Sequence, residues 1–107
     1  SGRLIMSGNS AFYSSNNSSI GRLNSKNGKI VFLKSFPGKK WVKYYGPLLL
    51  QNKLLVLATD KNAYWFSPQD GSLLNKEKLG KKISSPPVVT NKRLMFVSED
   101  GMLNILN

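Results

Sequence analysis

The sequence predicts an all-β fold, a β-propeller fragment of about two and three-quarter four-stranded antiparallel blades. Three observations predict it. The chain repeats itself every 40–43 residues, each repeat alternates strand-sized apolar runs with turn residues, and no stretch shows the apolar spacing of a ten-residue helix. Four short strands in about 40 residues are typical of a propeller blade.

The repeat is clearest between the middle and the end of the chain. Residues 47–67 align with residues 87–107 at a shift of 40 without a gap, and nine of the paired positions are apolar in both copies. A shift of 43 aligns the first unit with the second and places Gly28 on Gly71. The pairs that fit badly at this shift are Ser14 with Leu57 and Arg22 with Trp65.

Turn residues divide each unit into strands. In the central unit we expect strands at about residues 46–50, 54–59, 63–67 and 72–79. Asp, Asn, Gly and Pro between these runs favour tight hairpins. The three blades are therefore expected at about residues 4–38, 46–82 and 86–107, the last with only three strands.

The polarity of the strands predicts where each lies. Leu54–Ala58 and Leu94–Val97 are apolar on both faces, which predicts inner strands packed between neighbouring blades. Trp65 is expected in the same packing, whereas the polar run at residues 74–79 suits an outer rim. Because propellers need about four to eight blades, we expect part of a larger propeller or a truncated chain. Its two apolar end faces would make the isolated chain self-associate.

Composition excludes much catalytic chemistry. The 107 residues include no cysteine and no histidine, which removes disulfides, thiolate nucleophiles, Cys/His zinc sites and Ser-His-Asp triads. Five carboxylates against 16 Lys+Arg are too few and too scattered for a calcium cage or an acid/base pair. We therefore predict no enzyme, no metal and no cofactor on this chain.

Several segments resemble the quinoprotein-like (PQQ-repeat) β-propellers. The matching segments are Asn27–Phe32, Ser84–Val89 and Phe96–Leu106. Blades of that family typically carry a tryptophan where Phe32 and Asn75 stand, so the ring-locking tryptophan motif is weakened in this chain.

A narrower resemblance covers Trp41–Asn107. The segments Tyr44–Leu50, Asp70–Leu74 and Pro86–Val89 look like the C-terminal blades of the BamB family in its alphaproteobacterial form. That resemblance implies a non-catalytic, protein-binding scaffold of the bacterial outer-membrane β-barrel assembly machinery. It implies a periplasmic location at the outer membrane, with the anchor outside this segment. The implied partners are the barrel-forming subunit and nascent outer-membrane proteins. In the family the main contact loops belong to earlier blades, so no partner residue is carried over.

The enzymatic alternative is a C-terminal fragment of a PQQ-dependent dehydrogenase whose active site lies upstream. Those enzymes combine a vicinal cysteine disulfide with a calcium shell and a catalytic aspartate. Asp60, Asp70 and Asp100 instead fall where hairpin turns are expected, and turns select aspartate strongly. We assign these three residues to turns.

One segment interleaves cations with aromatic rings. The candidate partner-binding residues are Lys39, Lys40, Trp41, Lys43, Tyr44 and Tyr45. The favoured interpretation is an inter-blade crossover whose aromatics pack on the next blade while the lysines stay in solvent. The functional alternatives are an aromatic anchor for a protein partner and a stacking platform for single-stranded nucleic acid.

The net charge of +11 does not by itself favour nucleic acid. The cations are 13 lysines and only three arginines, whereas nucleic-acid readers favour arginine for bidentate contacts. A lysine-rich surface would still be attracted to an anionic membrane. A basic nucleic-acid-binding segment therefore remains the other alternative to the scaffold.

Overall fold

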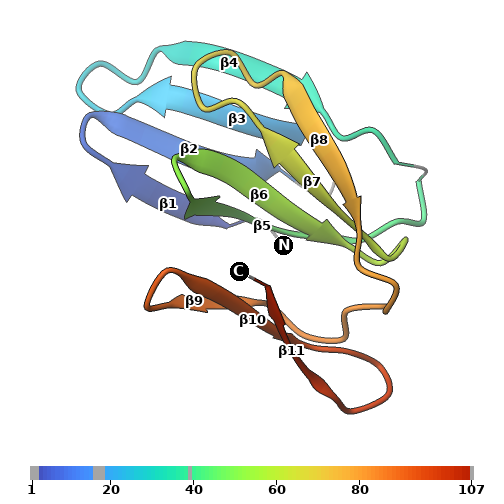
Figure 1. The fold of residues 1–107 in the computed structure, drawn as a ribbon. Coiled ribbons are helices and arrows are strands. Elements are labelled where there is room, and N and C mark those ends of the chain that lie inside the picture. Colours follow the sequence, from blue (N-terminus) through green and yellow to red (C-terminus); the bar gives the residue numbers. More distant parts are fainter. Residues whose placement is uncertain (1–2, 16–18, 39, 107) are drawn as a thin grey trace.

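The computed structural model describes residues 3–15, 19–38 and 40–106, and this part of the chain forms three antiparallel sheets (Figure 1). The first sheet consists of β1 (Leu4–Ser7), β2 (Ser10–Ser15), β3 (Ser19–Asn24) and β4 (Ile30–Ser35). The second consists of β5 (Tyr44–Leu50), β6 (Lys53–Ala58), β7 (Asn62–Phe66) and β8 (Leu73–Lys78). The third consists of β9 (Val88–Thr90), β10 (Arg93–Val97) and β11 (Leu103–Leu106). Sheets of four, four and three strands confirm the predicted all-β propeller fragment.

Strand order follows the chain within every sheet, so each strand pairs with the next through a hairpin. The hairpins between β5 and β6 and between β9 and β10 are equivalent in the repeat. Gln51 and Asn52 have φ of 54° and 58°, and Asn91 and Lys92 have φ of 48° and 62°. Two successive positive φ values are what a two-residue hairpin matching the strand twist requires. In the described part of the chain, no helix is long and apolar enough to cross a membrane.

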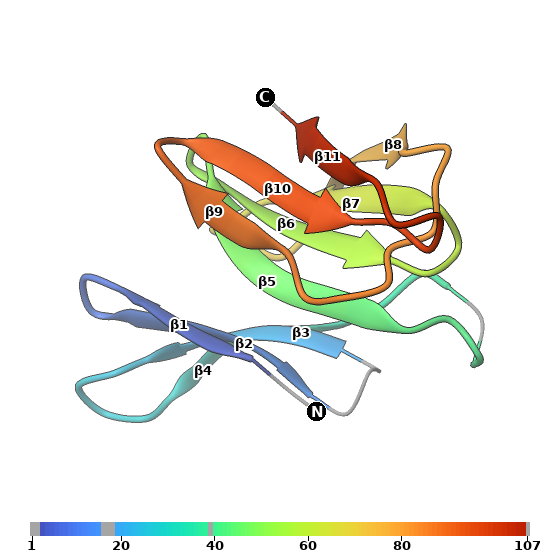
Figure 2. The same cartoon turned by 90° about the horizontal axis from the view of Figure 1, so that it is seen from below.

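The second sheet lies between the other two and is apolar on both faces (Figure 2). Along β6, Leu54, Val56 and Ala58 pack towards the first sheet, and Leu55 and Leu57 pack towards the third. All five are fully buried. Burying one such leucine contributes about 1.5–3 kcal/mol. The prediction that Leu54–Ala58 is an inner strand packed on both faces is confirmed.

The prediction of burial on both faces is wrong for Leu94–Val97. Leu94 and Phe96 pack against the second sheet, but Met95 is half-buried and Val97 is 37% exposed. The reason is that no described sheet covers the second face of β10. The outer position of the polar strand β8 and the inter-blade packing of Trp65 are as predicted.

Each end of the stack therefore presents an open apolar face. On the first sheet Leu4, Met6 and Leu33 are exposed. On the third sheet Leu103 and Ile105 are exposed. The pairing registers place each group on the face turned away from the second sheet.

Two polar side chains join the first sheet to the second. Ser14 Oγ donates a hydrogen bond to the carbonyl oxygen of Gly46 at 2.7 Å. Arg22 Nη1 donates to the carbonyl oxygen of Pro68 at 2.8 Å, and its guanidinium carbon lies 5.6 Å from the centre of the Phe12 ring. Ser14 and Arg22 are the residues that fit the repeat badly. Their polar groups form hydrogen bonds between the first and second blades.

Gly71 allows the β7–β8 turn to approach the first sheet closely. Its φ is +76°, and a Cβ at this position would lie 2.5 Å from Cδ1 of Phe32. Gly28, its partner in the repeat, has a φ of +72° and no heavy atom within 4 Å of a Cβ built there. The two glycines thus share a backbone conformation but differ in their surroundings.

We predict that Gly71→Ala is more destabilising than Gly28→Ala by about 1–3 kcal/mol, because only the first change pushes a methyl group into a neighbouring ring. In both variants an alanine must adopt a left-handed backbone conformation, which costs about 1–2 kcal/mol of stability. Urea unfolding of the two variants and the parent chain measures the difference. Equal free energies of unfolding would contradict the close contact between Gly71 and Phe32.

We also predict that the isolated chain self-associates through its open faces, because contiguous exposed apolar surface promotes association. Sedimentation velocity should show species larger than a monomer whose fraction rises with concentration. The double variant Leu33→Lys/Leu103→Lys places one charge on each face and should shift the distribution towards the monomer. A monomer at high concentration that melts cooperatively would contradict this prediction.

Candidate functional site

The candidate residues lie at the end of the blades where the chain passes from one sheet to the next. This connection end comprises residues 36–38, 40–43, 59–61, 79–87 and 98–102. Tyr44 pairs with Ala58 and Asn62 pairs with Lys78, which places the starts of β5 and β7 beside the ends of β6 and β8. The arrowheads of β6 and β10 point to this end in Figure 2.

The segment between β4 and β5 separates into inward and outward side chains. Phe36, Val42 and Tyr44 are buried in the core between the first two sheets. The rings of Phe36 and Tyr44 stack with centroids 4.2 Å apart. Lys40 and Lys43 are exposed, and Trp41 is 77% exposed. The buried rings hold the segment down, and the side chains between them face solvent.

Backbone hydrogen bonds fix Lys43 against the β6–β7 hairpin. Its N–H donates to Thr59 Oγ1 at 2.9 Å, and its carbonyl oxygen accepts from the Thr59 N–H at 2.9 Å. The hairpin continues with Asp60 and Lys61. In the described ranges, Lys40, Lys43 and Lys61 form no ion pair with an acidic side chain.

The structure divides the predicted site residues into two groups. Lys40, Trp41 and Lys43 are accessible to a partner. Tyr44 is 8% exposed, and Tyr45 packs against the core between the second and third sheets. These two tyrosines pack as expected for a crossover, whereas the expected packing is wrong for Trp41, whose ring is exposed. Lys39 lies outside the described residues. Partner binding by the exposed group stays a prediction.

The β6–β7 hairpin is closed by its aspartate. Asp60 accepts hydrogen bonds from the Asn62 N–H at 3.2 Å and from the Tyr64 hydroxyl. Burial, and then the hydrogen bond to Asp60, raise the pKa of Tyr64 well above its ordinary value. Burial also raises the pKa of Tyr44. Both phenols therefore stay neutral at neutral pH.

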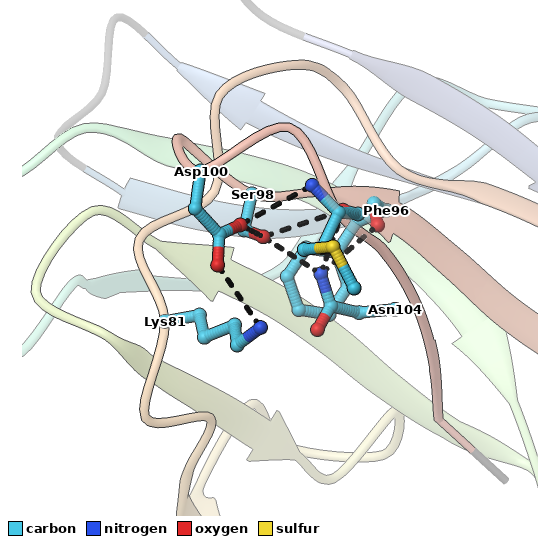
Figure 3. Close-up of polar contacts among 6 residues, drawn as sticks. Lys81, Phe96, Ser98, Asp100 and Asn104 are labelled. Carbon is cyan, nitrogen blue, oxygen red and sulfur yellow. Dashed lines mark hydrogen bonds and ion pairs between the residues drawn. The ribbon is translucent and has the colours of Figure 1, made fainter.

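The equivalent aspartate of the third blade is the centre of a larger network (Figure 3). Asp100 accepts hydrogen bonds from the Ser98 hydroxyl, from Lys81 Nζ at 3.0 Å and from the Met102 N–H at 3.2 Å. Asn104 Nδ2 donates to Ser98 Oγ at 2.9 Å. These bonds, the Ser98 bond first, lower the pKa of Asp100 to about 2. The carboxylate is thus held ionised by its own turn.

Ion pairs also tie the β8–β9 connection to the β10–β11 hairpin. Lys81 pairs with Asp100 at 3.0 Å, and Lys82 pairs with Glu99 at 3.6 Å. All four side chains are largely exposed, so each pair contributes little, about 0–1 kcal/mol. The connection is held in place more by a backbone hydrogen bond, which the Glu99 N–H donates to the Lys82 carbonyl oxygen at 2.9 Å.

Ser98 and Asn104 were not identified from the sequence. A serine two residues before an aspartate at an expected hairpin is the pattern that could have indicated Ser98. No comparable sequence pattern indicates Asn104. Its side-chain amide donates to Ser98 Oγ and to the carbonyl oxygens of Met102 and Phe96. Asp70 occupies a turn as predicted and accepts from the Ser72 N–H at 2.9 Å.

Several polar groups of the connection end are committed to one another. The Ser98 hydroxyl is committed to Asp100, and Lys81 is paired with the same carboxylate. No group of three or more acidic side chains that could hold a metal ion occurs in the described ranges. The accessible groups that remain near the crossover are an indole and three lysine amines, which can contact an apolar anchor or an anionic surface.

Comparison with solved structures identifies the architecture. The chain is similar to the crystal structure of BamB from Moraxella catarrhalis, with a TM-score of 0.78 and 17% identity over 96% of this chain and 31% of that chain. The chain has the fold of a β-propeller fragment. It spans about a third of the BamB chain.

Other propellers are similar as well. The computationally designed protein Ika4 has a TM-score of 0.70 at 12% identity, over 96% of this chain and 62% of that chain. The WD40 domain of SCAP from fission yeast has a TM-score of 0.63 at 17% identity, over 92% of this chain and 28% of that chain. No protein-family model and no curated protein matches the sequence. The resemblance to a BamB-like propeller is thus confirmed for the fold.

We predict that Asp100 makes stability depend on pH in the acid range. Its pKa is about 2 in the folded chain, against about 3.9 for an unfolded aspartate. The stabilisation is therefore fully present above about pH 4 and is lost as the pH falls towards 2, because the unfolded chain binds the proton first. Urea unfolding between about pH 2 and 6 should show a smaller decline for Asp100→Asn than for the parent chain.

Ser98→Ala provides the matched comparison, because it removes the bond that lowers the pKa of Asp100 most and keeps the carboxylate itself. It should flatten the acid decline only in part. An Asp100→Asn chain that loses stability with pH as steeply as the parent would contradict the assignment.

Proposed function

We propose that this chain is part of a non-catalytic propeller scaffold that serves the outer-membrane β-barrel assembly machinery in the periplasm. The observation that carries the proposal is the fold. The three sheets match BamB of Moraxella catarrhalis over 96% of the chain. A propeller offers a rigid frame with exposed loops, and such frames commonly position binding residues.

The proposed partners are the barrel-forming subunit of the machinery and nascent outer-membrane proteins. The proposed contact is the exposed group Lys40, Trp41 and Lys43. Tryptophan is enriched among the residues that dominate binding energy at protein interfaces. Lysines around such an anchor speed the approach of an acidic partner and add little affinity. The positive charge also suits a position beside an anionic outer-membrane surface.

The proposal is tested by measuring binding of the chain to the purified barrel-forming subunit. The variant Lys40→Ser/Trp41→Ser/Lys43→Ser should lower the affinity by at least about tenfold, because it removes a central aromatic anchor. Its unfolding midpoint should match that of the parent, since the three side chains are exposed.

The matched control is Lys26→Ser/Lys29→Ser, which removes the same number of charges at the opposite end of the blades. It should leave the affinity within about twofold. Equal losses in the two variants would show that only the overall charge matters, and absence of binding by the parent would contradict the proposal. Tight binding of single-stranded DNA that weakens steeply with salt would favour the nucleic-acid alternative instead.

A further inference from the structure

Exposed lysines lie in a row across the connection end of the second blade. Lys43 directly precedes β5, Lys61 directly precedes β7, and Lys78 is the last residue of β8. Backbone hydrogen bonds hold these segments side by side. Lys43 is joined to Thr59 by two bonds of 2.9 Å, and the Lys61 carbonyl oxygen accepts from the Leu79 N–H at 2.8 Å. The row therefore belongs to an ordered part of the blade.

The strand order gives the length of this lysine row. The second sheet has the order β5-β6-β7-β8, so two strand spacings separate Lys43 from Lys61 and one more separates Lys61 from Lys78. Neighbouring strands lie about 4.8 Å apart, which makes the row about 14 Å long at the backbone. An extended chain rises about 3.3 Å per residue. A bound segment of about five residues would therefore span the row.

The carboxylates nearest the lysine row are engaged within the blade. Asp60 is half-buried and accepts hydrogen bonds from the Asn62 N–H and from the Tyr64 hydroxyl. Glu77 accepts from Trp65 Nε1 at 3.1 Å. The neighbouring β8–β9 connection is balanced by its two ion pairs with the β10–β11 hairpin. Positive charge is thus concentrated at the end of the second blade, and it complements an acidic partner.

The aromatic residues of the crossover distinguish between acidic partners. Trp41 lies two residues before Lys43 and is largely exposed, whereas Tyr44 and Tyr45 pack between the blades. Platforms for single-stranded nucleic acid stack successive bases on several rings. A single exposed ring beside cations suits a polypeptide that carries one aromatic anchor next to its acidic residues.

We propose that the connection end of the second blade binds an extended acidic segment of a partner protein. An aromatic residue of that segment lies against Trp41, and its carboxylates lie along Lys43, Lys61 and Lys78. Each exposed ion pair contributes little by itself, but several in a row speed the encounter and select an acidic segment over a neutral one. The blade that carries this surface has four strands and a sheet packed on each face.

This inference rests on the proposed function, because it extends the same contact by Lys61 and Lys78 and names the chemistry of the partner. A model peptide separates the two. If the barrel-forming subunit binds the chain and the acidic peptide does not, the inference is overturned and the proposed function stands. If the peptide binds and the subunit does not, the inference stands and the proposed function is overturned.

The probe is a capped peptide of one phenylalanine followed by about five aspartate and glutamate residues, the number that spans the row. It is titrated into isotope-labelled chain at concentrations where light scattering reports a monomer. Backbone amide signals of residues 40–43, 59–61 and 78–79 should shift. A peptide with asparagine and glutamine in place of the acidic residues should bind at least about tenfold more weakly. Replacing the phenylalanine by serine should weaken binding by about fivefold.

Matched protein variants locate the contact. Lys61→Asn/Lys78→Thr removes two cations of the row and should weaken peptide binding by about fivefold. Asparagine tolerates the φ of 70° at position 61, and threonine suits an exposed strand position, so the unfolding midpoint should match that of the parent. Lys61→Arg/Lys78→Arg keeps both charges and should bind within about twofold of the parent.

The control Lys26→Ser/Lys29→Ser removes two charges at the opposite end of the blades and should also bind within about twofold. Equal losses in this control and in Lys61→Asn/Lys78→Thr would overturn the proposal, because only the overall charge would then matter. Shifts confined to other residues, or equal binding of the acidic and neutral peptides, would also overturn it. So would displacement of the peptide by oligothymidine or by anionic lipid vesicles at a lower concentration of negative charge than the peptide itself carries.

Discussion

The burial of the second sheet on both faces is the constraint on which the rest of the structure depends. A strand such as β6 that is apolar on two sides has no stable position at the surface of a protein, so it requires a sheet above and a sheet below. This demand fixes the stacking of the three blades. It also explains why polar residues collect on β8, at the connections and in the hairpins, which are the parts of a blade that no neighbour covers.

The stacking is refined by residues that break the repeat. Ser14 and Arg22 stand at repeat positions where the second blade has apolar residues. Each donates a hydrogen bond to a carbonyl oxygen of the neighbouring blade. Apolar contact is non-directional, whereas these two bonds and the fit of Gly71 on Phe32 set one lateral position of the first sheet on the second. Between the second and third sheets the matching residues are Leu57 and Trp65. That interface is held by apolar packing.

Much of the fold was predictable because it is local and repeated. The 40-residue shift located the strands, and Asn, Asp and Gly located the turns, since both depend on neighbours in the sequence. What failed depends on distant parts of the chain. Val97 is an apolar, β-branched residue of the kind found in buried strands, but its burial needs a covering sheet. Likewise the sequence of the candidate segment shows the aromatic residues but does not show which of them face the core. That division follows from the stacking of Tyr44 on Phe36 and from the bonds between Lys43 and Thr59.

The same logic separates the structural polar groups from those left for function. Three of the five carboxylates, those of Asp60, Asp70 and Asp100, accept hydrogen bonds from backbone N–H groups two residues ahead and are thereby committed to turns. A carboxylate held in this way is directed at its own loop, so it is poorly placed to act on a substrate. The surface that we propose for partner binding is of another kind: Trp41 and its flanking lysines lie in the crossover between the first two blades and are exposed to solvent. These side chains are presented by the buried rings on either side of them, so the packing that joins the two blades also positions the proposed contact.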